Sequence, residues 1–177
     1  MKNNKLEDSL NKLFSNSGYK MVDVSDKNVT HRKALASGEI VLSQEVINLI
    51  KDKKMPKCDP LSIAEVSGIN GVKKTSELIP LCHPLPLDHI SLHTELNENK
   101  NSIIVYCLVS ANSKTGVEME ALSGVTSALL AIYDLSKIVE PNLKISNTKL
   151  LVKSGGKKGL WINPDGIPKK IKDALNI

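Results

Sequence analysis

One long amphipathic helix restricts the fold of this chain more than any other feature of its sequence. From Glu118 to about Val139, apolar residues recur every three or four positions, and Pro141 stops the pattern. The main apolar stripe comprises Leu122, Val125, Leu129, Ile132 and Val139. A helix of this length with one apolar face has to bury that face against another layer, and we expect that layer to be a β-sheet.

Strand-like segments precede and follow this helix. Alternation of apolar and polar residues indicates a half-buried strand with Ile90, Leu92, Thr94 and Leu96 on one face. The sequence NENKN at 97–101 is a turn into an apolar strand over 102–110, and residues 143–152 predict a strand after the helix. An earlier strand is expected over 39–43.

Two more helices are expected between the first two strands. Ser43 is a candidate N-cap, and Asp59 followed by Pro60 is a second helix start. We expect Gly68 and Gly71 to interrupt or weaken that second helix. The resulting order of strand, helices, strand, strand, helix, strand predicts an α+β fold. It is the ferredoxin-like βαββαβ pattern, with helices packed on one face of the sheet and additional N-terminal helices.

The length of 177 residues provides room for one domain and little more. Residues 1–19 are rich in Asn, Lys and Ser, and we expect them to form a flexible N-terminal arm. The domain itself is expected over 20–159. Residues 160–177 are expected to form a C-terminal tail with a lysine-rich amphipathic segment, after the glycine loop SGGKKG at 154–159.

Composition excludes several classes of protein. Aromatic residues make up only 3% of the chain, which argues against a binder of single-stranded nucleic acid. The apolar runs are too short to span a bilayer, and no apolar leader segment is found at the N-terminus. Three cysteines without CxxC spacing indicate reduced thiols, so we expect a cytoplasmic protein. The net charge of +5 is compatible with an anionic ligand, and Arg32 is the only arginine.

A second stripe on the long helix is small in the middle and acidic at both ends: Glu120, Gly124, Ser127, Ala131 and Asp134. It is explained either by packing against another helix of the same chain or by close approach of a second copy. Glu120 and Asp134 are fourteen residues apart, about 21 Å along an α-helix, so one small substrate cannot touch both in a single chain. A two-fold axis near Ser127 would bring them together, and we therefore expect a homodimer with composite sites.

Several polar residues are candidates for chemistry. Lys137 follows Asp134 by three residues, so the two form either a surface salt bridge or an acid/base pair. His83 lies between prolines that fix its backbone, which suits a catalytic or phosphate contact. His89 and His93 would be about 13 Å apart on a strand and cannot chelate one metal ion. The SGGKKG loop is either a mobile turn or a phosphate-binding loop.

Five motifs occur in order with ordinary spacing: MVDVSDKNVTHR (21–32), KTSELIPLCHPLPL (74–87), KTGVEMEAL (114–122), AIYDLSK (131–137) and LLVKSGGKKG (150–159). Together they closely resemble the cyclic pyranopterin monophosphate synthase family of molybdenum cofactor (molybdopterin) biosynthesis. The resemblance implies a lyase that converts 3′,8-cyclo-7,8-dihydroguanosine triphosphate to cyclic pyranopterin monophosphate and diphosphate. It also implies a ferredoxin-like fold and no metal or organic cofactor. The expected assembly is a homohexamer built from dimers, with active sites at the dimer interface.

The resemblance implies catalytic roles for Asp134, Lys137 and Lys57, with the two lysines as the acid/base pair. We expect nearby cations to pull the pKa values of such lysines toward neutrality. The substrate-binding residues that it implies are Arg32, Lys73, Leu81, Cys82, His83, Glu118, Met119, Glu120 and Lys153. Of these, the basic residues Arg32, Lys73 and Lys153 suit a triphosphate.

The chain departs from the family's pattern at a few positions. Cys58 and Pro60 stand in a K-G-D-V segment, Glu65 replaces a cation, and Lys158 replaces a serine in the glycine loop. One alternative is therefore a catalytically impaired nucleotide-binding homologue of the same fold. A basic RNA-associated protein is a second alternative, which the scarcity of aromatic residues disfavours. The intact catalytic set favours the lyase.

Overall fold

The computed structural model describes residues 9–14 and 18–176 of the chain. Its first eight elements follow the order expected from the sequence, apart from the short α4, and two more are added at the C-terminal end. In chain order the elements are β1 (Thr30–Val41), α2 (Gln44–Lys51), α3 (Pro60–Lys73), α4 (Thr75–Leu78), β2 (His89–Asn97), β3 (Ser102–Ser113), α5 (Glu118–Ser136), β4 (Lys144–Ser154), β5 (Trp161–Ile162) and α6 (Lys169–Leu175). A short 3-10 turn, Glu98–Lys100, joins β2 to β3.

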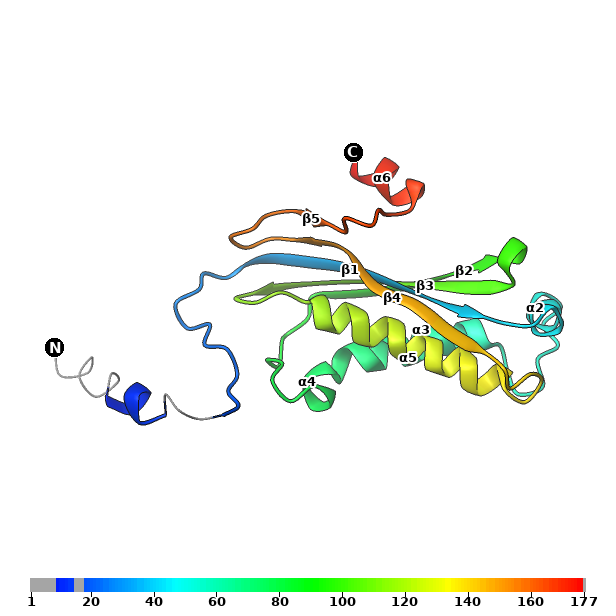
Figure 1. The fold of residues 1–177 in the computed structure, drawn as a ribbon, viewed down its shortest axis with the longest axis horizontal. Coiled ribbons are helices and arrows are strands. Elements are labelled where there is room, and N and C mark those ends of the chain that lie inside the picture. Colours follow the sequence, from blue (N-terminus) through cyan, green and yellow to red (C-terminus); the bar gives the residue numbers. More distant parts are fainter. Residues whose placement is uncertain (1–8, 15–17, 177) are drawn as a thin grey trace.

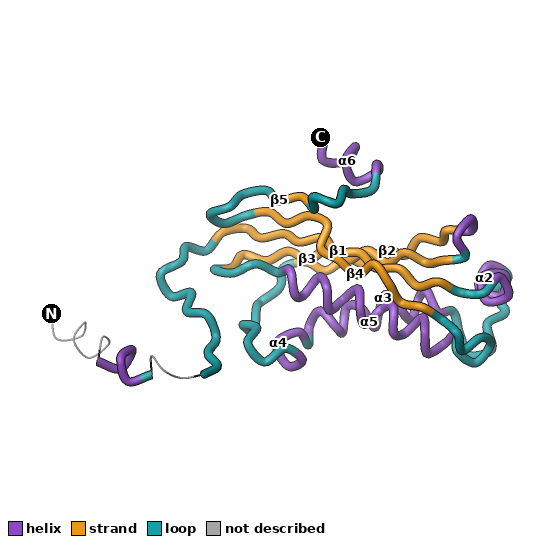
Figure 2. The backbone as a smooth tube through the Cα atoms, viewed as in Figure 1, coloured by secondary structure: helices purple, strands orange, loops and turns teal. Residues whose placement is uncertain are grey.

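The strands form one sheet in the order β2-β3-β1-β4-β5, and every neighbouring pair is antiparallel. The helices α3 and α5 lie side by side on one face of this sheet (Figure 1). Figure 2 shows the same two layers, with α6 alone on the opposite side of the strands. The ferredoxin-like α+β fold with helices packed on one face is therefore confirmed.

The main core lies between the sheet and α5. Val125, Leu129 and Ile132 of the expected apolar stripe are fully buried against the strands. A Cβ atom at Gly38 of β1 would lie 2.7 Å from side-chain atoms of both Leu129 and Val125. Glycine at this position therefore lets α5 settle directly on the central strand.

The two glycines of α3 do not interrupt it, so the expectation of an interruption was wrong. The helix runs unbroken from Pro60 to Lys73. A Cβ atom at Gly68 would lie 3.0 Å from the carbonyl oxygen of Gly124, and one at Gly71 would lie 2.9 Å from that of Ser123. These glycines are needed because the backbones of α3 and α5 approach each other closely.

Other boundaries differ from the sequence-based expectation by known causes. The first strand begins at Thr30 rather than Glu39, because its helix-facing residues Ala34, Ala36 and Gly38 are small and lack the β-branched signature of strands. The helix α5 ends at Ser136, where a turn replaces the expected last residues. Both N-caps are confirmed: the side chain of Ser43 accepts from the N–H of Val46, and that of Asp59 caps α3.

The C-terminal residues, expected to form a tail, pack against the sheet and are part of the folded domain. The strand β5 pairs with β4, and α6 lies over the face of the sheet opposite α3 and α5, the face that carries none of the main helices (Figure 1). A second, smaller apolar cluster forms there, with Tyr106, Leu151, Val152 and Ile167 at its centre. At the other terminus residues 9–13 are helical, and the rest of the expected arm falls partly outside the described residues. Among those described, no helix is long and apolar enough to cross a membrane.

Candidate functional site

The three residues expected to be catalytic lie together at one end of the helical layer. Asp134 is in the last turn of α5, Lys137 is its C-cap, and Lys57 precedes the first turn of α3. The carboxylate of Asp134 is 2.7 Å from the Nζ of Lys137 and 3.7 Å from that of Lys57. Antiparallel packing of α3 on α5 brings the start of one helix to the end of the other. We call this group the lysine–aspartate cluster.

The charges of the lysine–aspartate cluster stabilise one another. The hydrogen bond from Lys137, together with the positive charges of Lys137 and Lys57, lowers the pKa of Asp134. The same hydrogen bond raises the pKa of Lys137. The expectation that neighbouring cations lower the pKa of this lysine was therefore wrong, because its nearest charged neighbour is a carboxylate. In this state Lys137 is an ammonium group that donates hydrogen bonds.

A basic cleft of about 440 Å³ lies at the opposite end of the helical layer, between the ends of β1, β3 and β4. We define the basic cleft by Arg32, Glu118, Lys153 and the glycine loop 155–159, all of which line it. The Nζ of Lys153 is 2.9 Å from the Glu118 carboxylate. The guanidinium of Arg32 donates to the backbone carbonyls of Ser113 and Lys114, each at 3.4 Å.

The basic cleft includes cations to which the sequence analysis assigned no role: Lys27, Lys114, Lys157 and Lys158, which lie within the quoted motifs, and Lys33, which follows the first of them. Its acidic lining residues are Asp26 and Glu118. The signal was present, because Lys27 lies in the first quoted motif and Lys114 opens the third. Cations outnumber anions in this cleft, so it favours a ligand with several negative charges.

A smaller hollow of about 210 Å³ adjoins the start of α5. His83, Lys73 and Glu120 line it, together with apolar residues that include Leu85 and Ile90. Glu120 is only 5% exposed, and this burial raises the pKa of its carboxyl group. We call it the histidine hollow.

The other expected substrate contacts lie beside the histidine hollow rather than in it. Cys82 directly precedes His83 in the chain, and burial and then the negative charge of Glu120 raise the pKa of its thiol. Leu81 and Met119 line neither the hollow nor the basic cleft, and their side chains are 49% and 39% exposed. Large apolar side chains left exposed in this way are available to contact a ligand or another chain.

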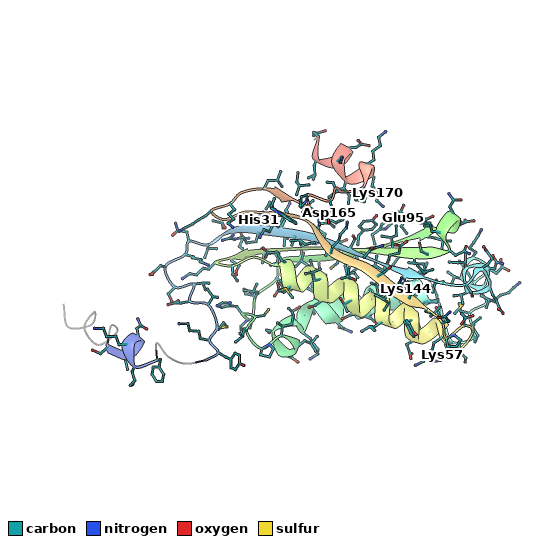
Figure 3. All side chains as sticks on the ribbon, in the orientation of Figure 1. His31, Lys57, Glu95, Lys144, Asp165 and Lys170 are labelled. Atoms are coloured by element: carbon teal, nitrogen blue, oxygen red, sulfur yellow. The ribbon has the colours of Figure 1, made fainter. Side chains whose placement is uncertain are left out.

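The lysine–aspartate cluster and the other two sites lie far apart. Glu120 and Asp134 are both in α5, which separates them by about 21 Å. Figure 3 shows the same separation: His31, the neighbour of Arg32, lies toward the left-hand part of the sheet, and Lys57 lies at the lower right of the helical layer. A small molecule bound to a single chain therefore cannot contact the lysine–aspartate cluster and the other two sites at once.

The small-residue stripe does not do what the sequence analysis inferred. Gly124 and Ser127 are in contact with Gly68 and Gly71 of α3 in the same chain. The middle of this stripe is thus covered by ordinary helix packing, the alternative explanation, whereas Asp134 at its end is exposed. Within residues 9–14 and 18–176, no group of three His, Cys, Asp or Glu side chains could hold a metal ion.

Comparison with known proteins gives one consistent result. The model of the MoaC family matches residues 21–156. The chain is 45% identical over 145 residues to the cyclic pyranopterin monophosphate synthase of Chloroflexus aurantiacus, which covers 82% of this chain and 89% of the relative. It is 40% identical over 158 residues to the protein of the same name from Heliobacterium modesticaldum, covering 89% of this chain and 99% of the relative.

Proposed function

Because the chain belongs to the MoaC family, we propose that it is a cyclic pyranopterin monophosphate synthase of molybdenum cofactor biosynthesis. The reaction converts 3′,8-cyclo-7,8-dihydroguanosine triphosphate to cyclic pyranopterin monophosphate and diphosphate. The observation that carries this function is the presence of a cation-lined cleft and a separate lysine–aspartate cluster in one small fold. The first suits the triphosphate, and the second suits proton transfer.

The basic cleft binds the triphosphate and stabilises the leaving diphosphate. Arg32 and Lys153 face the cleft from neighbouring strands, and Lys114 lines it at the end of β3. Negative charge accumulates on the departing diphosphate as its bond breaks, and fixed cations stabilise that charge without having to reorganise. On substrate binding Lys153 exchanges or shares its partner Glu118, which leaves the carboxylate free to accept a hydrogen bond from the substrate.

The lysine–aspartate cluster transfers protons during the rebuilding of the ring system. Asp134 stays ionised because two ammonium groups surround it, and it holds Lys137 in its protonated form. Lys137 is thus ready to donate a proton, while Lys57, at 3.7 Å, is the more loosely held of the two. Each ammonium group can give a proton to the substrate, and the amine that results can accept a proton at a later step, so the two lysines together provide the acid and the base that the reaction requires.

A second copy of the chain completes the site. The outer face of α5 carries exposed Met119, Thr126, Leu130 and Asp134, and it lies beside exposed Ile63 and Val66 of α3. Thr126 stands midway between Met119 and Asp134. A two-fold axis beside Thr126 would therefore bring the lysine–aspartate cluster of one chain to the basic cleft and histidine hollow of the other. We extend this dimer to a hexamer by analogy with the family.

The alternatives receive less support. No observation favours the impaired nucleotide-binding homologue, because Asp134, Lys137 and Lys57 are all present and in contact. All three cysteines are free, which supports the cytoplasm as the place of action. The described residues contain no aromatic-lined groove for RNA, and only one ring pair, His93 with Tyr106, is stacked.

Diphosphate release by the purified protein from 3′,8-cyclo-7,8-dihydroguanosine triphosphate tests this function. We expect release by the unmodified chain and by Lys54→Ala, a matched change at an exposed lysine that pairs with Asp52 instead of Asp134. Lys57→Ala should abolish release while still binding the substrate. Tight substrate binding without release by the unmodified chain would instead establish the impaired homologue and direct attention to Cys58 and Glu65.

A further inference from the structure

The residues beyond the family match form a strap across the helix-free face of the sheet. The match ends at residue 156, and the strap comprises residues 161–175, from the start of β5 to the end of α6. It leaves the edge of the sheet at β5 and returns over the central strands, as Figures 1 and 2 show.

The first part of the strap is hydrogen-bonded to β4. Trp161 pairs with Lys153, and Ile162 pairs with Val152. Asn163 extends this pairing, because its N–H donates to the carbonyl of Leu151 at 2.9 Å and its side-chain amide donates to that of Leu150 at 2.7 Å. The register of β5 is therefore set directly opposite a residue of the basic cleft.

The far part of the strap is anchored by apolar and ionic contacts. Ile167 is only 8% exposed and belongs to the small cluster around Tyr106. Lys170 forms an ion pair with Glu95 of β2, and its Nζ lies 4.2 Å from the centroid of the Tyr106 ring. Figure 3 shows Lys170 and Glu95 on the same side of the sheet. The strap thus spans the sheet from β4 to β2.

The glycine loop is the connection between β4 and the strap, so both of its ends are fixed. Inside the loop the N–H of Gly159 donates to the carbonyl of Gly156 at 3.2 Å. Gly155 lies against the backbone of His31, and Gly156 lies against the guanidinium of Arg32. The position of the loop relative to Arg32 and Lys153 therefore depends on the register that the strap imposes.

We propose that the strap is a positioning element which holds the glycine loop over the basic cleft in the conformation that binds the triphosphate. The inference rests on the proposed function, but its anion-binding step is measurable without turnover. A loop with one free end has to be ordered when the ligand binds, which costs conformational entropy and weakens binding. Once the triphosphate is bound, the loop is ordered with or without the strap, and the lysine–aspartate cluster lies at the other end of α5. Loss of the strap should therefore weaken binding and change kcat little.

Releasing the strap should leave the domain folded. The main core is built from residues of β1 to β4 and α2, α3 and α5, and none of its buried members comes from the strap. Ile167 belongs only to the second, smaller cluster. Ile167→Asp therefore places a charge under the strap and detaches it, while Ile167→Val retains the contact.

The test measures binding of inorganic tripolyphosphate by calorimetry and amide hydrogen exchange at 155–159. If the detached loop spends about a tenth of its time in the conformation that binds the triphosphate, Ile167→Asp should weaken tripolyphosphate binding about tenfold and raise KM for the substrate by the same factor. Loop exchange should become faster, and kcat should stay within about twofold, because bound triphosphate orders the loop before the diphosphate leaves. Unchanged tripolyphosphate binding and loop exchange in a folded Ile167→Asp protein would overturn the proposal.

A charge exchange provides a second route if Ile167→Asp fails to fold. Lys170→Glu sets two carboxylates against each other at Glu95, and Lys170→Glu with Glu95→Lys restores an opposite pair. Lys172→Glu is the matched control, because it makes the same charge change at an exposed position of α6. Weakening by Lys170→Glu beyond that of Lys172→Glu, with recovery in the double variant, supports the strap. Equal effects of both single variants would overturn it. If the unmodified chain binds tripolyphosphate but releases no diphosphate, only the proposed function fails.

Discussion

Gly156 offers a sharp test of the basic cleft because a second glycine of the same loop serves as its control. Both residues have left-handed backbones, with φ of +70° at Gly156 and +61° at Gly159. A Cβ atom at Gly156 would overlap the guanidinium of Arg32, whereas one at Gly159 would meet nothing within 4 Å. The two alanine substitutions therefore share their backbone strain and differ only in whether Arg32 has to move.

The magnitude follows from these two contributions. Left-handed backbone costs an alanine about 1–2 kcal/mol, and this loss should be nearly equal in the two variants. Displacing Arg32 removes in addition a charged hydrogen bond to the triphosphate, which is worth about 1.5–3 kcal/mol. Gly156→Ala should therefore lower kcat/KM by roughly 10- to 150-fold relative to Gly159→Ala.

Steady-state diphosphate release and calorimetric binding of tripolyphosphate measure this difference. Thermal unfolding checks that the two variants are equally stable, since neither glycine is part of the main core. If Gly156→Ala and Gly159→Ala have the same kcat/KM, Arg32 does not bind the triphosphate through the position that the loop imposes. The assignment of the basic cleft would then be refuted.

Three further predictions concern the helical layer. Gly71→Ala forces α3 and α5 apart and should lower the free energy of unfolding by about 1–3 kcal/mol, which lowers Tm by about 2–4 °C per kcal/mol. Gly18→Ala, whose Cβ would stand in open space, should leave Tm unchanged. Equal Tm values for the two variants would refute the packing argument. Asp59→Ala removes the N-cap of α3 and should cost about 1 kcal/mol in urea unfolding, and an unchanged midpoint would contradict this. Burial raises the pKa of Glu120 above its ordinary 4.5, so the folded protein holds the Glu120 proton more tightly than the unfolded chain does. The free energy of unfolding therefore falls as pH rises from the ordinary pKa of Glu120 through its raised pKa in the folded protein. Glu120→Gln should therefore raise Tm at pH 7 more than at pH 4, and an equal gain at both would contradict it.

The long helix was predictable because its periodicity is a local property of the sequence. Burial of Val125, Leu129 and Ile132 follows directly from their spacing. The strand β1 was mostly missed, because small residues such as Ala36 and Gly38 occupy its helix-facing side. These residues are small because α5 packs directly on them, and that contact is a property of the tertiary structure that the local sequence does not reveal.

The candidate site likewise contains one contact that the local sequence predicts and one that only the tertiary structure explains. Contact between Asp134 and Lys137 follows from their spacing of three on a helix. Nothing local connects Lys57 to Asp134, since only the antiparallel packing of α3 on α5 brings them together. The resemblance to a family supplied that residue, and periodicity could not.

Two conclusions failed for a common reason. The small-residue stripe was interpreted as a surface between copies, and the pKa of Lys137 was expected to fall. Both inferences required knowledge of the nearest neighbours, which are the glycines of α3 in one case and the carboxylate of Asp134 in the other. The strap was unpredictable for the same reason, because Glu95 and Tyr106 meet Lys170 only through the sheet topology.

The central claim is that two copies of the chain complete each active site. The most direct measurement mixes two inactive variants, Lys57→Ala and Lys153→Ala, and isolates the hybrid by two affinity tags. Each hybrid dimer would contain one intact site and one doubly altered site, so the isolated hybrid should show about half of full diphosphate release and the unseparated equal mixture about a quarter. Lys57→Ala mixed with Asp134→Ala, both in the lysine–aspartate cluster, should regain none. A verified Lys57→Ala and Lys153→Ala hybrid without activity would contradict the account.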